Sequence, residues 1–335
     1  MKKVQFKTIY WFLMGVFPAR LRKKLNLAFH CFASEWDFAV NVYLFSAPFA
    51  ALEEDEITRR LAGLDAKSID VAKNYVRRCR NLERIKGYPF SDGSKVLLDI
   101  ASVGEDVMCA PPVPPELKKF QKKYGFKTGA EVLIYQHGLS FFKEQISNYI
   151  KNKIFIDAGA CIGELVPPLL EYFPQKIYAF EPSEINTVRF VKEMEKRRIP
   201  REKAEIVTVA LGAVEGFISF DDCGGSGQNL AVGDKNQCRV MPLDDFISGK
   251  SLSPVGLIKT DVEGMGLELL RGAINTIKRD RPVLSLAAYH NVEELLGQYE
   301  FLKEQLTDYH FELRDLPPGS SFEVTLIGFP NKLLW

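Results

Sequence analysis

A short apolar run that ends at a carboxylate and turns through two glycines constrains the fold more than any other part of the chain. Residues 153–164 read Lys-Ile-Phe-Ile-Asp-Ala-Gly-Ala-Cys-Ile-Gly-Glu, which places Asp157 at the end of the run and Gly159 and Gly163 in the turn. The pattern predicts a β-strand, a tight turn and the start of a helix. In an open α/β sheet, ligands bind at the carboxyl ends of strands, and glycines let them approach the backbone closely. We therefore expect the functional site at this turn.

Apolar runs alternate with helical stretches beyond this point, which predicts a doubly wound, mostly parallel sheet. The runs that predict its seven strands lie at 154–157, 176–180, 204–211, 255–261, 282–290, 309–314 and 322–328. Only a short Pro-Pro-Gly turn joins the last two runs, so they should pair antiparallel. Two further runs, 131–135 and 217–220, predict an additional strand and a hairpin. Pro167 and Pro168 fall inside the first predicted helix, which should begin late or bend.

The length of 335 residues suits two domains. A proline-rich stretch at 109–115 predicts a boundary between an N-terminal, mainly helical accessory region over 1–110 and a second domain over 111–335. Residues 1–24 contain an apolar run between basic runs, and this run is too short to span a bilayer. It predicts either peripheral contact with a membrane or a buried helix whose lysines reach the surface. Arginines between 77 and 84 predict a basic helix face, which is either solvated or contacts a polyanion.

Charge and cysteine content exclude several classes of function. The 44 Lys and Arg residues nearly balance the 43 Asp and Glu residues, so there is no bulk positive field to bind nucleic acid. The six cysteines include no C-x-x-C pair, which disfavours zinc and a disulfide framework. We expect a cytoplasmic protein, with possible contact at the inner face of a membrane, no nucleic-acid partner and no metal. The sequence does not predict an oligomeric state.

The residue that opens the turn decides between cofactors. A dinucleotide site has the pattern G-x-G-x-x-G, whereas this chain has Asp157 in the place of the first glycine. A carboxylate there repels a pyrophosphate but can accept hydrogen bonds from the ammonium group of a sulfonium cofactor, which passes close to Gly159 and Gly163. Glu181 ends the next predicted strand, where it can accept from two ribose hydroxyls, and Ser183 follows it. This arrangement favours S-adenosylmethionine.

Five ordered motifs resemble those of the FkbM family of S-adenosylmethionine-dependent methyltransferases. The hallmark among them is the K-x-D-x-E-G stretch of residues 259–264, which a leucine-rich L-x-G-A helix follows. Similar segments lie at 157–163, 180–182, 240–246 and 281–290. The resemblance covers about residues 131–290. It implies a class I, Rossmann-like methyltransferase fold, with a mostly parallel seven-stranded sheet and an antiparallel C-terminal strand. It also implies methyl transfer, usually to an oxygen of a small-molecule, glycan or lipid-linked acceptor.

One position departs from the family pattern. Family members commonly have a larger acidic residue where Gly266 stands, so we expect a helix-capping or substrate contact to be missing there. This glycine and the paired prolines motivate a second hypothesis, in which the chain is a catalytically silent cofactor-binding scaffold that docks a partner through its N-terminal region. A glycine-rich loop at 224–229 predicts either a mobile cover over the site or a flexible hairpin tip.

Three residues are the catalytic candidates. Asp261, Glu263 and His290 follow two predicted strands and should meet at one edge of the sheet, near the cofactor. We expect His290 to act as the base, because an imidazole titrates near neutrality, with Asp261 orienting it or the acceptor hydroxyl. Two alternatives stay open: His290 holds the loop through a carboxylate, or the three residues bind a divalent cation. Lys259 should support the sheet edge or pair with Glu263, and His137 should be structural.

Overall fold

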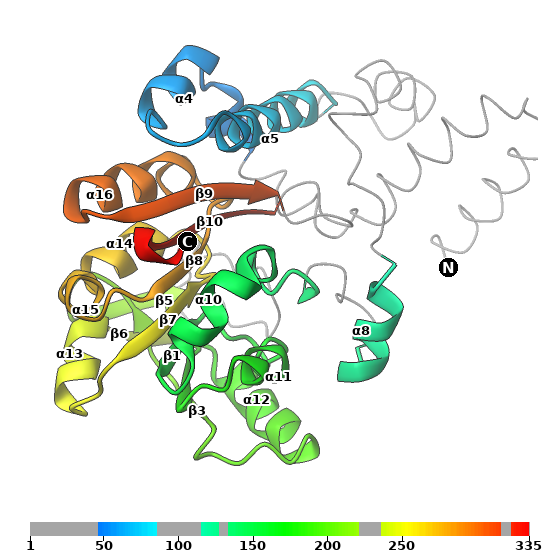
Figure 1. Cartoon of the computed structure of the whole chain (residues 1–335), viewed down its shortest axis with the longest axis vertical. Coiled ribbons are helices and arrows are strands. Elements are labelled where there is room, and N and C mark those ends of the chain that lie inside the picture. The colour runs from blue at the N-terminus through cyan, green and yellow to red at the C-terminus, as the bar shows by residue number, and fades with distance from the viewer. Residues whose placement is uncertain (1–45, 86–114, 127–132, 221–235, 316–322, 335) are drawn as a thin grey trace, which may run out of the picture.

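The computed structural model of the chain describes residues 46–85, 115–126, 133–220, 236–315 and 323–334 (Figure 1). Three predicted features therefore lie wholly or mostly outside the described residues. They are the segment 1–24, the proline-rich stretch 109–115 and the glycine-rich loop 224–229.

A seven-stranded sheet forms the centre of the described structure. Its order is β3-β2-β1-β7-β8-β10-β9, and β10 pairs antiparallel with both of its neighbours. The strands are β1 (Ile154–Ala158), β2 (Lys176–Phe180), β3 (Ala204–Val207), β7 (Val255–Thr260), β8 (Val283–Ala287), β9 (Tyr309–Asp315) and β10 (Val324–Pro330). All residues of β1, β7 and β8 are buried, as expected for parallel strands that are covered on both faces. The predicted class I sheet with one antiparallel C-terminal strand is confirmed.

Successive residues of β1 contribute to two separate hydrophobic clusters, one on each face of the sheet. Ile154 and Ile156 belong to one cluster, and Phe155 belongs to the other. The helices on the Phe155 side are α10 (Lys143–Ile150), α11 (Val166–Leu169) and α12 (Glu184–Lys196). Those on the other side are α5 (Ala66–Ile85), α13 (Leu243–Gly249), α14 (Gly266–Arg271), α15 (Ile274–Asp280) and α16 (Gln298–Gln305). Short elements complete the fold: α4 (Glu54–Arg60), α8 (Leu117–Tyr124), the 3-10 turns η1 (Leu139–Phe142), η2 (Leu170–Tyr172) and η4 (Asn331–Leu333), and the π-helical turn η3 (Glu293–Gly297).

The described N-terminal helices pack on the β9 side of the sheet (Figure 1). Tyr75 of α5 is fully buried in the same cluster as the sheet residues, and its hydroxyl donates to the carbonyl of Tyr289 at 2.6 Å. The basic face of α5 is largely engaged within the fold, since Arg78 pairs with Asp315 at 3.1 Å and Arg77 bonds Glu54. The division of the chain at residue 110 stays a prediction.

Three local predictions can be compared with the structure. The strand predicted at 131–135 is wrong for its described part, which is a helix end and turn: the Leu133 carbonyl accepts from the Gln136 amide at 2.9 Å, a bond between residues three apart that closes a turn. The hairpin around 217–220 belongs to a second sheet of β4 (Ala210–Leu211), β5 (Gly216–Phe220) and β6 (Asn236–Met241). Helix α11 spans only four residues and continues as a 3-10 turn, which confirms the effect of the paired prolines.

Candidate functional site

The glycine turn after β1 lies directly against the end of β7. Three of its residues have left-handed backbone conformations, with φ of +74° at Gly159, +47° at Cys161 and +83° at Gly163. A Cβ atom at Gly159 would lie 1.7 Å from the carbonyl oxygen of Asp261, so no side chain fits there. The turn is also tied to β2, because the Gly159 amide donates to the Phe180 carbonyl at 2.9 Å. Glycine is therefore needed to bring the ends of β1, β2 and β7 together.

Glu181 stands at the end of β2 beside this turn. Its carboxylate accepts hydrogen bonds from the amides of Cys161 at 2.9 Å and Ser183 at 3.0 Å. The Ser183 hydroxyl in turn caps α12 by accepting from the amide of Asn186 at 3.0 Å. Burial raises the pKa of Glu181. The Asn186 side chain also bonds to this carboxylate, so three groups hold Glu181 in place. A carboxylate has about four acceptor positions, so Glu181 can still accept from a ligand.

Asp157 forms a buried ion pair with Lys259 of the neighbouring strand. The Lys259 ammonium lies 3.0 Å from the Asp157 carboxylate and donates to the Gly159 carbonyl, also at 3.0 Å. Burial alone lowers the pKa of Lys259, but the carboxylates of Asp157 and Asp261 raise it above its usual value. Lys259 therefore pairs with Asp157 and not with Glu263. Asp157 is fully buried, so it supports the turn from beneath through this lysine.

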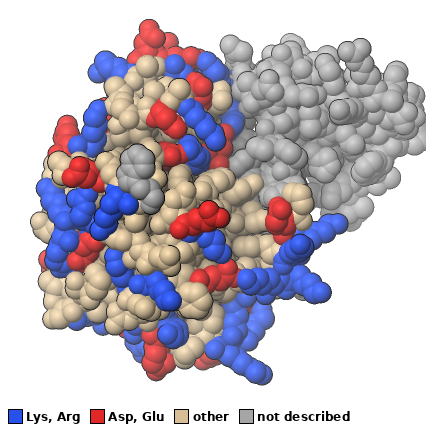
Figure 2. Space-filling model, in the orientation of Figure 1, with Lys and Arg blue, Asp and Glu red and all other residues tan. Residues whose placement is uncertain are grey.

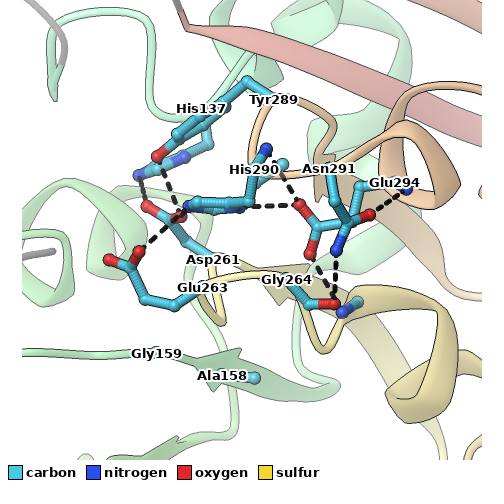
Figure 3. Close-up of polar contacts among 12 residues, drawn as sticks. His137, Ala158, Gly159, Asp261, Glu263, Gly264, Tyr289, His290, Asn291 and Glu294 are labelled. Atoms are coloured by element: carbon cyan, nitrogen blue, oxygen red, sulfur yellow. Dashed lines mark hydrogen bonds and ion pairs between the residues drawn. The ribbon is translucent and has the colours of Figure 1, made fainter. Parts of the chain in front are cut away.

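A second group of polar side chains gathers where β7 and β8 end (Figure 3). The Nε2 atom of His290 lies 3.4 Å from Asp261 Oδ1 and 3.6 Å from Glu263 Oε2. The Tyr289 hydroxyl donates to Asp261 Oδ1 at 2.9 Å. Asp261 and Glu263 keep 23% and 29% of their side-chain surface exposed, whereas His290 is buried. The structure thus brings the three predicted catalytic residues together, and two of them reach solvent.

The neighbours of His290 bear on its protonation state. Its Nδ1 atom lies 2.6 Å from Glu294 Oε2, on the side of the ring opposite Asp261 and Glu263 (Figure 3). Burial alone lowers the pKa of His290, but the carboxylates of Glu294, Asp261 and Glu263 together raise it to about 10. An imidazolium has no free lone pair. These contacts favour the other role left open for His290, in which it bonds a carboxylate and holds the loop, over the role of base.

Two residues of the cluster were not predicted as part of the site. His137 comes from the turn before η1, and its Nε2 atom lies 4.0 Å from Asp261 Oδ2. Burial lowers the pKa of His137 to about 4, so this ring is neutral. Glu294 is buried and follows His290 by four residues, a spacing that places two side chains together on a helical turn. The four-residue spacing of His290 and Glu294 could be recognised in the sequence, whereas no local pattern around His137 connects it to Asp261.

Acidic side chains outnumber cationic ones around the turn and the cluster. The acidic residues are Asp157, Glu164, Glu181, Asp261, Glu263 and Glu294, and the cations are Lys259 and His290. A surplus of buried or half-buried carboxylates favours a cationic sulfonium or ammonium group over a pyrophosphate. Within the described ranges, no group of three or more metal-binding side chains has the geometry of a metal site.

The comparison with protein families assigns this region. Residues 157–316 match the family described as the methyltransferase FkbM domain. These residues form an FkbM methyltransferase domain. The domain contains both halves of the site, from Asp157 through Asp261 to Glu294, and its family is S-adenosylmethionine-dependent. Glu181 beside the glycine turn and the surplus of acidic side chains fit this cofactor.

Solved methyltransferase structures are similar to the chain at low identity. An FkbM methyltransferase from Methylobacillus flagellatus is 20% identical, with a TM-score of 0.48 over 79% of this chain and 61% of that one. The O-methyltransferase of Bacillus cereus, in complex with S-adenosylhomocysteine, is 12% identical, with a TM-score of 0.42 over 68% and 94%. The N-terminal domain of human METTL16, in the same kind of complex, is 14% identical, with a TM-score of 0.41 over 63% and 78%. No curated protein matches the sequence.

Proposed function

We propose that the chain transfers a methyl group from S-adenosylmethionine to a hydroxyl oxygen of a small molecule, a glycan or a lipid-linked saccharide. The observation that carries this proposal is the pair of partly exposed carboxylates, Asp261 and Glu263, directly beside the glycine turn. A carboxylate in this position can accept the hydrogen bond of a hydroxyl and orient its oxygen. Both residues keep part of their side-chain surface exposed, so both can face an acceptor.

The first half of the edge would hold the cofactor. Gly159 and Gly163 shape the turn, since a Cβ atom at these positions would meet Asp261 and Phe190 respectively. Glu181 would accept from the ribose hydroxyls while Ser183 fixes the helix start beside it. Asp157 would act through Lys259 on the turn, and Asp261 would lie at the boundary between cofactor and acceptor. Bound there, S-adenosylmethionine supplies an electrophilic methyl group.

Asp261 is the base in this proposal, in place of His290. Burial alone raises the pKa of Asp261, but Lys259, His290 and the Tyr289 hydroxyl lower it below its usual value. Asp261 is therefore ionised at neutral pH. As the acceptor oxygen bonds to the methyl carbon and the carbon–sulfur bond breaks, the hydroxyl proton passes to Asp261 and S-adenosylhomocysteine leaves. A positioned base contributes typically about 10²- to 10⁴-fold, and alignment of the reactants contributes the rest.

Transfer of a labelled methyl group tests the proposal. The protein is incubated with S-adenosylmethionine that carries a labelled methyl group and with extracts of small molecules, glycans and lipid-linked saccharides. We expect label in a product that withstands mild alkali, as an ether does. Label lost in alkali would indicate a carboxyl acceptor, and label on nitrogen would indicate an amine; either result contradicts O-methylation.

The silent scaffold is the second candidate, and the four-residue helix α11 in the cofactor half favours it. It predicts that the protein binds S-adenosylhomocysteine but labels no acceptor in any of these extracts. It also predicts that His290→Ala has no effect in cells. Turnover on any acceptor would exclude it.

Peripheral membrane contact through residues 1–24 stays a prediction, because this segment lies outside the described residues. Among the helices that the structure describes, none has the length and apolar character to cross a bilayer. High-speed sedimentation of membranes with the full chain and with a chain that lacks residues 1–24 tests the contact. Equal distribution of the two proteins would exclude this segment as an anchor.

A further inference from the structure

One buried carboxylate joins three elements at the acceptor half of the edge. Glu294 belongs to η3, and 1% of its surface is exposed. Its Oε2 atom accepts from the backbone amide of His290 at 3.3 Å and lies 2.6 Å from the His290 ring. Its Oε1 atom accepts from the amide of Gly266 at 3.0 Å, at the first residue of α14. Glu294 therefore connects the end of β8 with the start of the helix that follows Asp261 and Glu263.

The absence of a side chain at residue 266 makes room for this carboxylate. A Cβ atom at Gly266 would lie 2.8 Å from Glu294 Oε1 and 3.2 Å from Gln298 Oε1. Gln298 is fixed in turn, because its amide donates to the carbonyls of Ala287 at 2.7 Å and Glu294 at 3.0 Å. The helix-capping contact that the sequence predicted to be missing at Gly266 is thus made from η3, by Glu294.

The neighbouring Asn291 reinforces the same connection. Its side-chain oxygen accepts from the Glu294 amide at 2.8 Å, and its side-chain nitrogen donates to the Gly264 carbonyl at 2.9 Å (Figure 3). Glu263 and Gly264 have φ of +50° and +98°, so this bond holds a backbone conformation that a glutamate rarely adopts. The side chains of residues 291 and 294 together fix the loop that presents Glu263.

Charged groups from two elements face the His290 ring. Asp261 and Glu263 lie on the Nε2 side, and Glu294 lies on the Nδ1 side. The Tyr289 ring packs on it with centroids 4.1 Å apart, and neutral His137 lies beyond Asp261. Without Glu294, the ring would lose its closest anion and its only contact at Nδ1 among the described residues. Asp261 and Glu263 would stay near the ring only if the loop that carries them kept its conformation.

We propose that Glu294 is a positioning residue of the transfer reaction: it holds His290 as an imidazolium and fixes the loop that presents Asp261 and Glu263 to the acceptor. This inference rests on the proposed function for its kinetic part, but not for the state of the His290 ring. Because the imidazolium lies within ion-pair distance of both carboxylates, its charge holds them near the ring, and with no free lone pair it cannot abstract a proton. Glu294 itself is too far inside the fold to touch an acceptor.

Nuclear magnetic resonance of the histidine side chains tests the proposal without requiring turnover. The chain has four histidines, so a ¹⁵N-histidine-labelled sample gives few imidazole signals, and His290→Gln assigns the one of interest. In the wild type we expect the His290 ring to stay doubly protonated at pH 8. In Glu294→Gln we expect its acid dissociation constant to rise at least tenfold. The matched control is Glu293→Gln, which changes the exposed neighbour in the same turn and should leave the signal unchanged.

Two results would overturn the proposal. The first is a wild-type His290 ring that titrates near pH 6.5, which needs no variant and therefore holds even if Glu294→Gln does not fold. The second is a folded Glu294→Gln protein with an unchanged His290 titration. Where an acceptor is known, Glu294→Gln should also lower kcat by at least tenfold with little change in the KM for S-adenosylmethionine, and an equal loss in Glu293→Gln would count against a positioning role. Absence of turnover in the wild type would contradict the proposed function while the ring titration still decides this inference.

Discussion

The two halves of the functional edge hold their carboxylates in different ways. At the ends of β1 and β2, Asp157 lies against a lysine and Glu181 accepts from backbone amides, so each is fixed by its own partner. At the ends of β7 and β8, three carboxylates share one imidazolium, and the side chains of residues 291 and 294 hold the backbone. We call the first half, which contains Asp157, Gly159, Gly163 and Glu181, the glycine cradle. The second is a coupled cluster in which the carboxylates raise the pKa of His290 and His290 helps to lower the pKa of Asp261.

The glycine cradle should give the largest stability effect. Gly159→Ala places a Cβ atom 1.7 Å from the Asp261 carbonyl at a φ of +74°, so the β1 turn must move away from β7. We expect a loss of about 5 kcal/mol in the free energy of unfolding, measured by urea denaturation. Gly216→Ala is the control, because nothing lies within 4 Å of its Cβ position. A similar small loss in both variants would show that the close approach is not needed.

The coupled cluster should give the largest kinetic effect. Asp261→Asn removes the proposed base and should lower kcat about 10²- to 10⁴-fold, measured in single-turnover reactions. Asp245→Asn, at an exposed position of α13, is the control. If Asp261→Asn kept full activity while His290→Gln abolished it, the assignment of the base would be reversed.

The buried ion pair of Asp157 and Lys259 should contribute to the free energy of unfolding, because each charge neutralises the other. Lys259→Met leaves the Asp157 carboxylate buried without its partner and should lower the free energy of unfolding by about 3 kcal/mol. Lys250→Met, on an exposed lysine, should change it by less than about 0.5 kcal/mol. The double variant Asp157→Leu with Lys259→Met should recover part of the loss. If the double variant were no more stable than Lys259→Met, the loss would come from the changed shape of the side chains and not from the unpaired charge.

The two buried histidines should give smaller and opposite pH effects. The pKa of His290 is raised to about 10 in the fold, so its stabilisation is complete below about pH 6.5 and declines as pH rises toward 10. Its share falls by about 2 kcal/mol between pH 6.5 and 8. The pKa of His137 is lowered to about 4, so acidification from pH 6.5 to 5.5 costs about 1 kcal/mol at this residue. The free energy of unfolding of His290→Gln and of His137→Gln, measured across this pH range and compared with the wild type, gives the contribution of each histidine. The same pH dependence in wild type and variant would contradict the prediction for that histidine.

The cradle was more readable from the sequence than the cluster. Asp157, Gly159 and Gly163 lie within one strand-turn segment, and their backbone conformations follow from local sterics. The mostly parallel sheet and its antiparallel strand also followed from the alternation of apolar runs and the short last connection. The sequence did not predict that Lys259, on the neighbouring strand, forms an ion pair with the Asp157 carboxylate.

The cluster depends on contacts between residues far apart in the chain. His137 lies more than 120 positions before Asp261, and no local pattern pairs them. The sequence placed Asp261, Glu263 and His290 at one edge, but it did not give the charge of His290, which depends on Glu294 on the far side of the ring. Residue types can therefore predict where a site lies, whereas the protonation states within it follow from three-dimensional packing.

Calorimetric titration with S-adenosylhomocysteine tests the central claim most directly, because it reports on the cradle without requiring an acceptor. The wild type should bind, and Glu181→Ala should bind at least tenfold more weakly, since it loses the proposed contacts with the ribose hydroxyls. Glu184→Ala, at an exposed position in the first turn of α12, should bind as the wild type does. Absence of binding by the folded wild type, or equal binding by wild type and folded Glu181→Ala, would contradict the account.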